Sequence, residues 1–188
     1  MAVNFFEELV KTYFQTRGFF TIENVPYQIP TTSKIDPKYA HGSSDIDILA
    51  VHLTKKSNKI YAVSCKGHPD GIKIDHAINA ISTGGNVHDR DARKAFRELA
   101  FGEWGGAFKG AVHQRTGSAN FVHVTACTKF SGDPLKWTLN EQFQKNLKGN
   151  ALELLTLKTI WDHLSNADNK LLHQNPTVRH VMGMFNVA

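Results

Sequence analysis

Apolar residues near the start of the chain recur every three or four positions, which predicts an amphipathic helix over residues 3–17. Asn4 is a suitable N-cap for this helix, and Gly18 is a suitable stop. The next segment, 19–29, is rich in aromatic and β-branched residues and predicts a strand that ends near Pro30. The apolar face of the helix comprises Phe6, Leu9, Val10, Tyr13 and Phe14.

Two strongly apolar segments follow a polar loop, at 45–53 (DIDILAVHL) and 59–65 (KIYAVSC). The connection between them is short, so we expect an antiparallel hairpin. Later in the chain, residues 120–128 (NFVHVTACT) predict a buried strand and residues 151–155 a further strand.

Helical patterns separate and follow these strands. Residues 102–117 are rich in glycine and give no clear helix or strand signal, so a turn-rich connection is expected there. This order of elements predicts an α/β fold with a central mixed sheet flanked by helices. We expect one domain over residues 1–165, with 166–188 as a tail or a short helix packing on it. The predicted helices cover 73–82, 89–101, 134–147 and 157–164.

Composition narrows the class of protein. No run of 18 apolar residues occurs, so a membrane span is not expected, and the N-terminus lacks a secretory signal pattern. Cys65 and Cys127 lie in apolar runs without metal-type spacing, which predicts buried reduced thiols and a cytoplasmic protein. The net charge of +5 favours a polyanionic partner such as nucleic acid.

The hairpin also carries the candidate chemistry. Alternation along a strand places Asp45 and Asp47 on one face, and Ser64 and Lys66 on one face of the next strand. If the two polar faces coincide, a carboxylate and an ammonium converge at one end of the sheet. A carboxylate suits Mg²⁺ or Mn²⁺, and a neighbouring lysine can position water and offset charge on a phosphate.

The segments SDIDILAV and YAVSCKG resemble the catalytic hairpin of the PD-(D/E)XK nuclease superfamily. The order of elements is similar to the Mrr-like restriction endonuclease branch, with counterparts in FFEELVKTYFQTRGFF, FVHVTACTKF and ALELLTLKTIWDHL. The resemblance spans roughly residues 5–164. It implies a restriction-endonuclease-like core and metal-dependent hydrolysis of DNA, of the restriction or repair type.

The resemblance also implies roles for individual residues. Asp47 matches the metal-binding aspartate, Lys66 the catalytic lysine and Glu7 a helix glutamate that contacts metal or water, with Glu8 as its alternative. The backbone carbonyl of Cys65 would be a further metal ligand. Ser64 departs from the pattern, because the family usually has Glu, Asp or Gln there, and this leaves Ser64 an auxiliary role. Asp45 either supplies the missing carboxylate or caps the loop end.

Several alternatives stay open. Arg90, Arg93, Lys94 and Arg97 predict either a phosphate-binding face or a solvated face paired with interleaved acids. Trp104 and Phe108 are available for stacking on bases if residues 102–117 form a loop. The rival functions are a nucleic-acid-binding module that does not cleave and an assembly subunit of a nuclease. A homodimer or a larger nuclease assembly is compatible with each.

Overall fold

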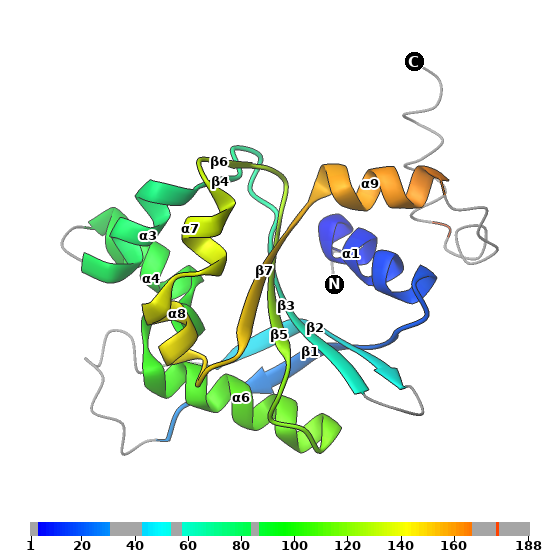
Figure 1. Cartoon of the computed structure of the whole chain (residues 1–188), viewed down its shortest axis with the longest axis horizontal. Helices are drawn as coiled ribbons and strands as arrows, with labels where there is room; N and C mark the ends of the chain where they lie inside the picture. Colours follow the sequence, from blue (N-terminus) through cyan, green and yellow to red (C-terminus); the bar gives the residue numbers. More distant parts are fainter. Residues whose placement is uncertain (1–3, 31–42, 54–57, 84–86, 167–175, 177–188) are drawn as a thin grey trace.

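A five-stranded sheet forms the centre of the fold in the computed structural model, which describes residues 4–30, 43–53, 58–83, 87–166 and 176. The strand order is β1-β2-β3-β5-β7 (Figure 1). The pairs β1–β2 and β2–β3 are antiparallel, and the pairs β3–β5 and β5–β7 are parallel, so the sheet is mixed. The strands are β1 Phe20–Tyr27, β2 Ser44–Leu53, β3 Asn58–Lys66, β5 Val122–Cys127 and β7 Ala151–Thr156.

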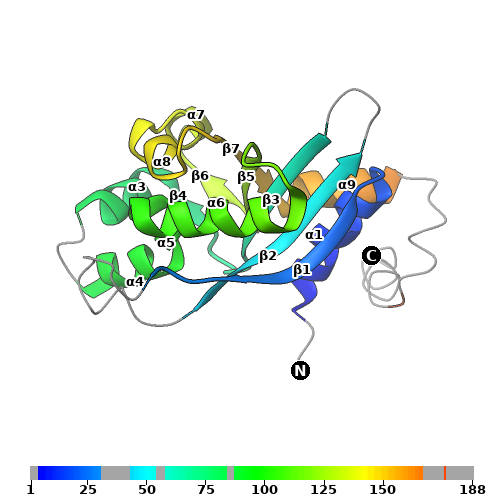
Figure 2. The same cartoon turned by 90° about the horizontal axis from the view of Figure 1, so that it is seen from below.

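Helices cover both faces of this sheet, which confirms the predicted α/β class (Figures 1 and 2). Helices α1 Phe5–Thr16 and α9 Leu157–Asn166 lie on one face. The long helix α6 Gly102–Thr116 and a group of shorter helices lie on the other. The shorter elements are β4 Ile72–Lys73, α3 Ile74–Thr83, α4 Val87–Ala95, α5 Arg97–Ala100, β6 Phe130–Ser131, α7 Pro134–Thr138 and α8 Glu141–Asn146.

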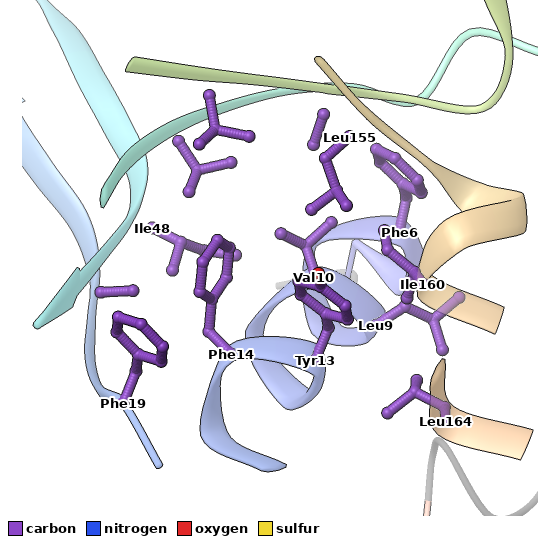
Figure 3. Packing of buried hydrophobic residues seen from close by; sticks show 14 residues of the cluster. Phe6, Leu9, Val10, Tyr13, Phe14, Phe19, Ile48, Leu155, Ile160 and Leu164 are labelled. Atoms are coloured by element: carbon purple, nitrogen blue, oxygen red, sulfur yellow. The ribbon is translucent and has the colours of Figure 1, made fainter. Parts of the chain in front are cut away.

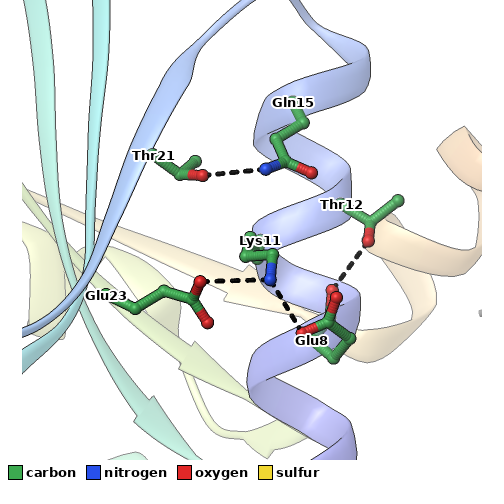
Figure 4. A network of polar contacts seen from close by, with 6 residues as sticks. All are labelled: Glu8, Lys11, Thr12, Gln15, Thr21 and Glu23. Carbon is green, nitrogen blue, oxygen red and sulfur yellow. Dashed lines mark hydrogen bonds and ion pairs between the residues drawn. The ribbon is translucent and has the colours of Figure 1, made fainter. Parts of the chain in front are cut away.

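Helix α1 forms as its sequence predicts. The side chain of Asn4 accepts a hydrogen bond from the backbone N–H of Phe6 at 3.2 Å, and Gly18 takes a φ of +85° just after the helix. Its apolar face packs between α9 and the sheet, against Ile160 and Leu155 among others (Figure 3). Its polar side contacts β1 through a Lys11–Glu23 ion pair and a Gln15–Thr21 hydrogen bond (Figure 4).

The helix predicted over 89–101 is instead two helices, α4 and α5, separated at Phe96. Phe96 takes a φ of −126°, outside helical values, and its ring packs edge-on against Trp137 at a centroid distance of 5.3 Å. A continuous charged helix would keep one solvated face along its length, whereas the break turns Phe96 and Glu98 into the interior. In the same way the helix predicted over 134–147 is divided into α7 and α8, and Asn140 caps the second of these.

The glycine-rich segment 102–117 is a helix, so the expectation of a turn-rich connection is wrong. Trp104 and Phe108 are fully buried against β1 and β5, which removes them as stacking platforms for bases. Position 105 requires glycine, because a Cβ on Gly105 would lie 2.0 Å from the carbonyl oxygen of Asn146. Glycine therefore lets the α6 backbone approach α8 closely.

The predicted tail over 166–188 lies outside the described residues apart from Asn166 and Pro176, as does most of the loop predicted before β2. Across the described ranges, no helix combines the length and apolar content needed to cross a membrane.

Two alanine substitutions in α6 test this packing. Gly105→Ala is expected to lower the free energy of unfolding by about 1–3 kcal/mol, because the new methyl group meets backbone atoms that cannot move away. Gly110→Ala, in the same helix with nothing within 4 Å of its Cβ position, should raise it by about 0.5–1 kcal/mol. Urea unfolding followed by circular dichroism measures both, and equal effects would contradict the close approach of α6 to α8.

Candidate functional site

Asp47 lies where β2 leaves the regular ladders of the sheet. The β1–β2 register pairs Glu23 with Ile48 and Val25 with Ile46 but omits the Asn24–Asp47 pair between them. The β2–β3 ladder ends at Ile48–Val63, just before Asp47. Asn24 has a φ of +51°, the left-handed conformation that Asn tolerates better than most residues. The main chain is therefore irregular on both strands at this level.

The irregularity changes which side chains face which helix. Ile48 packs in the cluster under α1, whereas Ile46, two residues earlier, packs in the cluster under α6. Strict alternation along β2 would have put Ile46 and Ile48 on one face, and Asp45, Asp47 and Leu49 together on the other. The alternation is therefore broken at Asp47, and Asp45 and Leu49 do not share a face. The Asp47 carboxylate instead turns toward β3, where its Oδ2 accepts a hydrogen bond from the backbone N–H of Cys65.

Burial is the largest influence on the Asp47 carboxyl group, and it raises its pKa to about 6. The positive charge of Lys66 and the Cys65 N–H act in the opposite direction, while the negative charges of Glu7 and Asp45 add to the rise. Burial, with contributions from Asp45 and Glu23, also raises the pKa of Glu7. Glu7, Asp45, Asp47 and Lys66 therefore interact through their charges.

The predicted facing of β3 is confirmed. Val63 and Cys65 pack toward α1, whereas Ser64 contacts α5 and the Lys66 Nζ lies 5.4 Å from the centre of the Phe96 ring. Cys65 and Cys127 are both free, and Cys127 is buried. Burial raises the pKa of the Cys65 thiol well above its ordinary value, so a thiolate nucleophile is disfavoured there.

Glu98 is the residue that sequence analysis missed. It lies in α5 with a side chain that is only 3% exposed, and three strands supply its hydrogen-bond partners. The Ser64 hydroxyl donates to its Oε1 at 3.0 Å, and the Tyr27 hydroxyl donates to its Oε2 at 3.4 Å. The Nε2 of His123, which is 0% exposed, lies 3.2 Å from Oε1. A carboxylate from α5 is therefore hydrogen-bonded to Ser64, the position at which the nuclease hairpin that the sequence resembles would have an acidic residue.

The environment keeps Glu98 ionised. Burial acts to raise its pKa, but the hydrogen bond and charge of His123, followed by the charge of Lys66, outweigh burial and lower the pKa to about 2. Glu98 is thus a buried anion within electrostatic reach of the same lysine as Asp47. Its sequence signal was the apolar run Leu99–Phe101 directly after it, which is unusual for an acid on a solvated helix face.

A divalent cation at this site would have few protein side chains as ligands. Within the described part of the chain, no three His, Cys, Asp or Glu side chains are grouped so that they could hold a metal ion. Mg²⁺ nonetheless often binds through one or two carboxylates and completes its shell with water and substrate phosphate oxygens. The half-buried Asp47 carboxylate and the main-chain carbonyl of Cys65 suit such partial coordination and do not form an all-protein cage.

The predicted basic face, Arg90, Arg93, Lys94 and Arg97, is partly engaged in contacts within the protein. Arg93 donates from Nε to the carbonyl oxygen of Ile81 at 3.0 Å and lies over the Phe101 ring. Arg97 lies over the Trp104 ring at 4.9 Å. Lys94 is exposed, and the side chain of Arg90 lies outside the described residues. Packing thus engages two of the four cations.

Comparisons with known proteins give no relative from which a function could be transferred. No protein-family model, no curated protein and no solved structure matches the chain.

The buried anion predicts a specific acid sensitivity. The pKa of Glu98 is lower in the folded state than its ordinary value of 4.5, so its stabilisation is present above that pH and is lost as the pH falls toward 2. In Glu98→Gln, the decrease in the free energy of unfolding between these two pH values should be smaller than in the parent by roughly 3 kcal/mol. Urea unfolding at a series of pH values measures the slope. Glu153→Gln, at an exposed position on β7, is the matched control, and identical slopes for parent and Glu98→Gln would show that Glu98 is not held ionised.

Proposed function

We propose that this protein is a metal-dependent endonuclease that hydrolyses phosphodiester bonds in DNA, with Mg²⁺ or Mn²⁺ as its cofactor. The observation that supports the proposal is that the charge of Lys66 acts on two carboxyl groups from different elements. Asp47 lies at the break in β2, and the buried Glu98 lies in α5. Restriction and repair enzymes carry out this class of reaction, and the chain's net charge of +5 suits a polyanionic substrate.

Asp47 is the proposed principal cation ligand, with the carbonyl of Cys65 beside it. Its carboxylate is half-buried, and this desolvation, together with the negative charges of Glu7 and Asp45, raises its pKa. A divalent cation would relieve this repulsion, so the site favours the cation it is proposed to bind. When bound, the cation would offset the negative charge of the scissile phosphate. Glu7 contributes through its charge or through an ordered water.

Lys66 is the proposed catalytic residue for the attacking water. Its ammonium group can donate hydrogen bonds to that water and to a phosphate oxygen, and so orient the water and stabilise the charge that develops in the transition state. The Lys66 Nζ lies 5.4 Å from the centre of the Phe96 ring, and the charges of Asp47 and Glu98 attract the ammonium. This restricts the positions that the ammonium can occupy.

Glu98 is proposed as a positioning residue for Lys66. Ser64 is a neutral side chain, and its hydroxyl is engaged in a hydrogen bond to Glu98. The negative charge that position 64 lacks is therefore supplied from α5. Because the Glu98 oxygens already accept bonds from Ser64, Tyr27 and His123, we assign the carboxylate an electrostatic role and not direct ligation of the cation.

The second candidate function is a nucleic-acid-binding or assembly subunit that does not cleave. It is favoured by the absence, among the described side chains, of a group of three metal ligands. The two functions differ in one outcome, because the subunit would bind DNA without metal-dependent cutting.

Cleavage of supercoiled plasmid with Mg²⁺, Mn²⁺ or EDTA tests the proposal. The parent protein should nick DNA only with the metals, and Asp47→Asn and Lys66→Ala should each reduce the rate by about 10²-fold or more. The exposed residues Asp162 and Lys145 provide matched controls, since Asp162→Asn and Lys145→Ala remove the same charges elsewhere. DNA binding by the parent without cleavage under any metal would select the binding module.

Metal binding should depend on pH through Asp47. A proton competes with the cation for the carboxylate, and the pKa of Asp47 is raised to about 6. Below that pH the affinity for Mn²⁺ should fall by about tenfold per pH unit, whereas above it the affinity should level off. Titration calorimetry with Mn²⁺ and no DNA measures this, with Asp47→Asn as the control that should bind weakly at every pH. A pH-independent affinity would place the cation elsewhere.

A further inference from the structure

Strand β1 forms one edge of the central sheet and carries an exposed apolar pair. Phe20 is 71% exposed and Ile22 is 41% exposed. Across the described residues, the other large apolar side chains with comparable exposure are Leu135 of α7 and Leu139, which directly follows α7. An edge strand with exposed apolar side chains is a template for pairing with another strand, and natural proteins usually block such edges.

The two side chains point to the same face of the sheet. Thr21 and Glu23 turn toward α1, where Gln15 and Lys11 contact them (Figure 4). Alternation therefore places Phe20 and Ile22 on the opposite face. That is the face α6 covers farther along β1, where Val25 and Tyr27 are buried under Trp104 and Phe108. Among the elements that the structure describes, none covers this end, and Phe20 and Ile22 form a short apolar ridge at the edge of the sheet.

We propose that β1 pairs antiparallel with β1 of a second copy of this chain, so that Phe20 and Ile22 are covered and the two five-stranded sheets join edge to edge. A two-fold axis makes such an interface isologous, with the same segment contributed by both copies. The inference does not rest on the proposed function, because it uses neither Asp47 nor Lys66.

The side chains select one register. An axis through Thr21 sets Phe20 of each copy opposite Ile22 of the other, which gives two aromatic–β-branched pairs on one face. An axis through Glu23 would set two carboxylates opposite each other, and an axis through Ile22 would set Phe20 opposite Asn24. The Thr21 register is therefore the one that covers both apolar side chains without opposing like charges.

Charge and backbone chemistry agree with this register. The β1 sequence FTIENVPY contains no Lys or Arg, although the whole chain has a net charge of +5. Its one acid, Glu23, is paired with Lys11 at 3.1 Å, so two copies can meet here without strong repulsion. Pro26 has no N–H to donate, and this restricts the new pairing to the first part of the strand.

Sedimentation of the full chain over a concentration series, without DNA, tests the proposal. The parent should pass from monomer to dimer, and Phe20→Glu should weaken the association by roughly tenfold or more because the carboxylate would be buried against Ile22. Leu139→Glu is the matched control, because Leu139 is 65% exposed and directly follows α7, far from β1 in the sequence, and this variant should associate like the parent. Circular dichroism checks that each variant is folded.

Thr21→Cys tests the register itself. Directly opposed strand residues lie within the Cα separation that a disulfide spans, so mild oxidation should produce a covalent dimer. Leu139→Cys and the parent, with its two cysteines, should not form it. A monomeric parent, or a dimer that survives Phe20→Glu and leaves Thr21→Cys uncrosslinked, would overturn the proposal. Asp47→Asn should dimerise normally, which separates failure here from failure of the nuclease proposal.

Discussion

The buried charge of Glu98 constrains the arrangement of the α6 side of the molecule. An ionised carboxylate in a protein interior is strongly destabilising unless several donors compensate for its lost hydration. Here the donors come from three strands: Tyr27 of β1, Ser64 of β3 and His123 of β5. Helix α5 must therefore lie where it can reach all three, and the break at Phe96 that separates it from α4 allows this. The same charge then acts on Lys66, so a feature of the core also bears on the candidate site.

The gap in the ladders at Asp47 is the second determinant of the site. A regular β2 would have used its main chain to pair with both neighbours, and its side chains would have pointed strictly up and down. The left-handed conformation of Asn24 and the change of face between Ile46 and Ile48 instead leave room for a side chain within the sheet. Asp47 occupies that room and binds the Cys65 N–H. Its carboxylate is thereby half-buried and close to charged neighbours, and this combination shifts its pKa.

The two ends of β1 have different surroundings. One end is buried by α6 through Val25 and Tyr27, and the Tyr27 hydroxyl contributes to the Glu98 network. The other end is held to α1 through its polar side chains and leaves Phe20 and Ile22 exposed. Edge pairing at that end would leave Asp47 and Lys66 untouched. The proposed association therefore uses β1, whereas the proposed chemistry uses Asp47 of β2 and Lys66 of β3.

The sequence by itself determined the main helices and strands and which side chains of β3 share a face. Local periodicity and turn signals were sufficient for α1 with its Asn4 cap, for the β2–β3 hairpin, for β5 and β7, and for the common face of Ser64 and Lys66. Only tertiary packing decided that residues 102–116 are helical, and Gly105 serves a close contact with α8 that no local signal reports. It also decided the break at Phe96 and the placing of Glu98 beside Ser64, 34 positions earlier in the chain. Alternation and spacing describe neighbours along the chain, whereas a charge network is assembled from residues that only the folded sheet brings together.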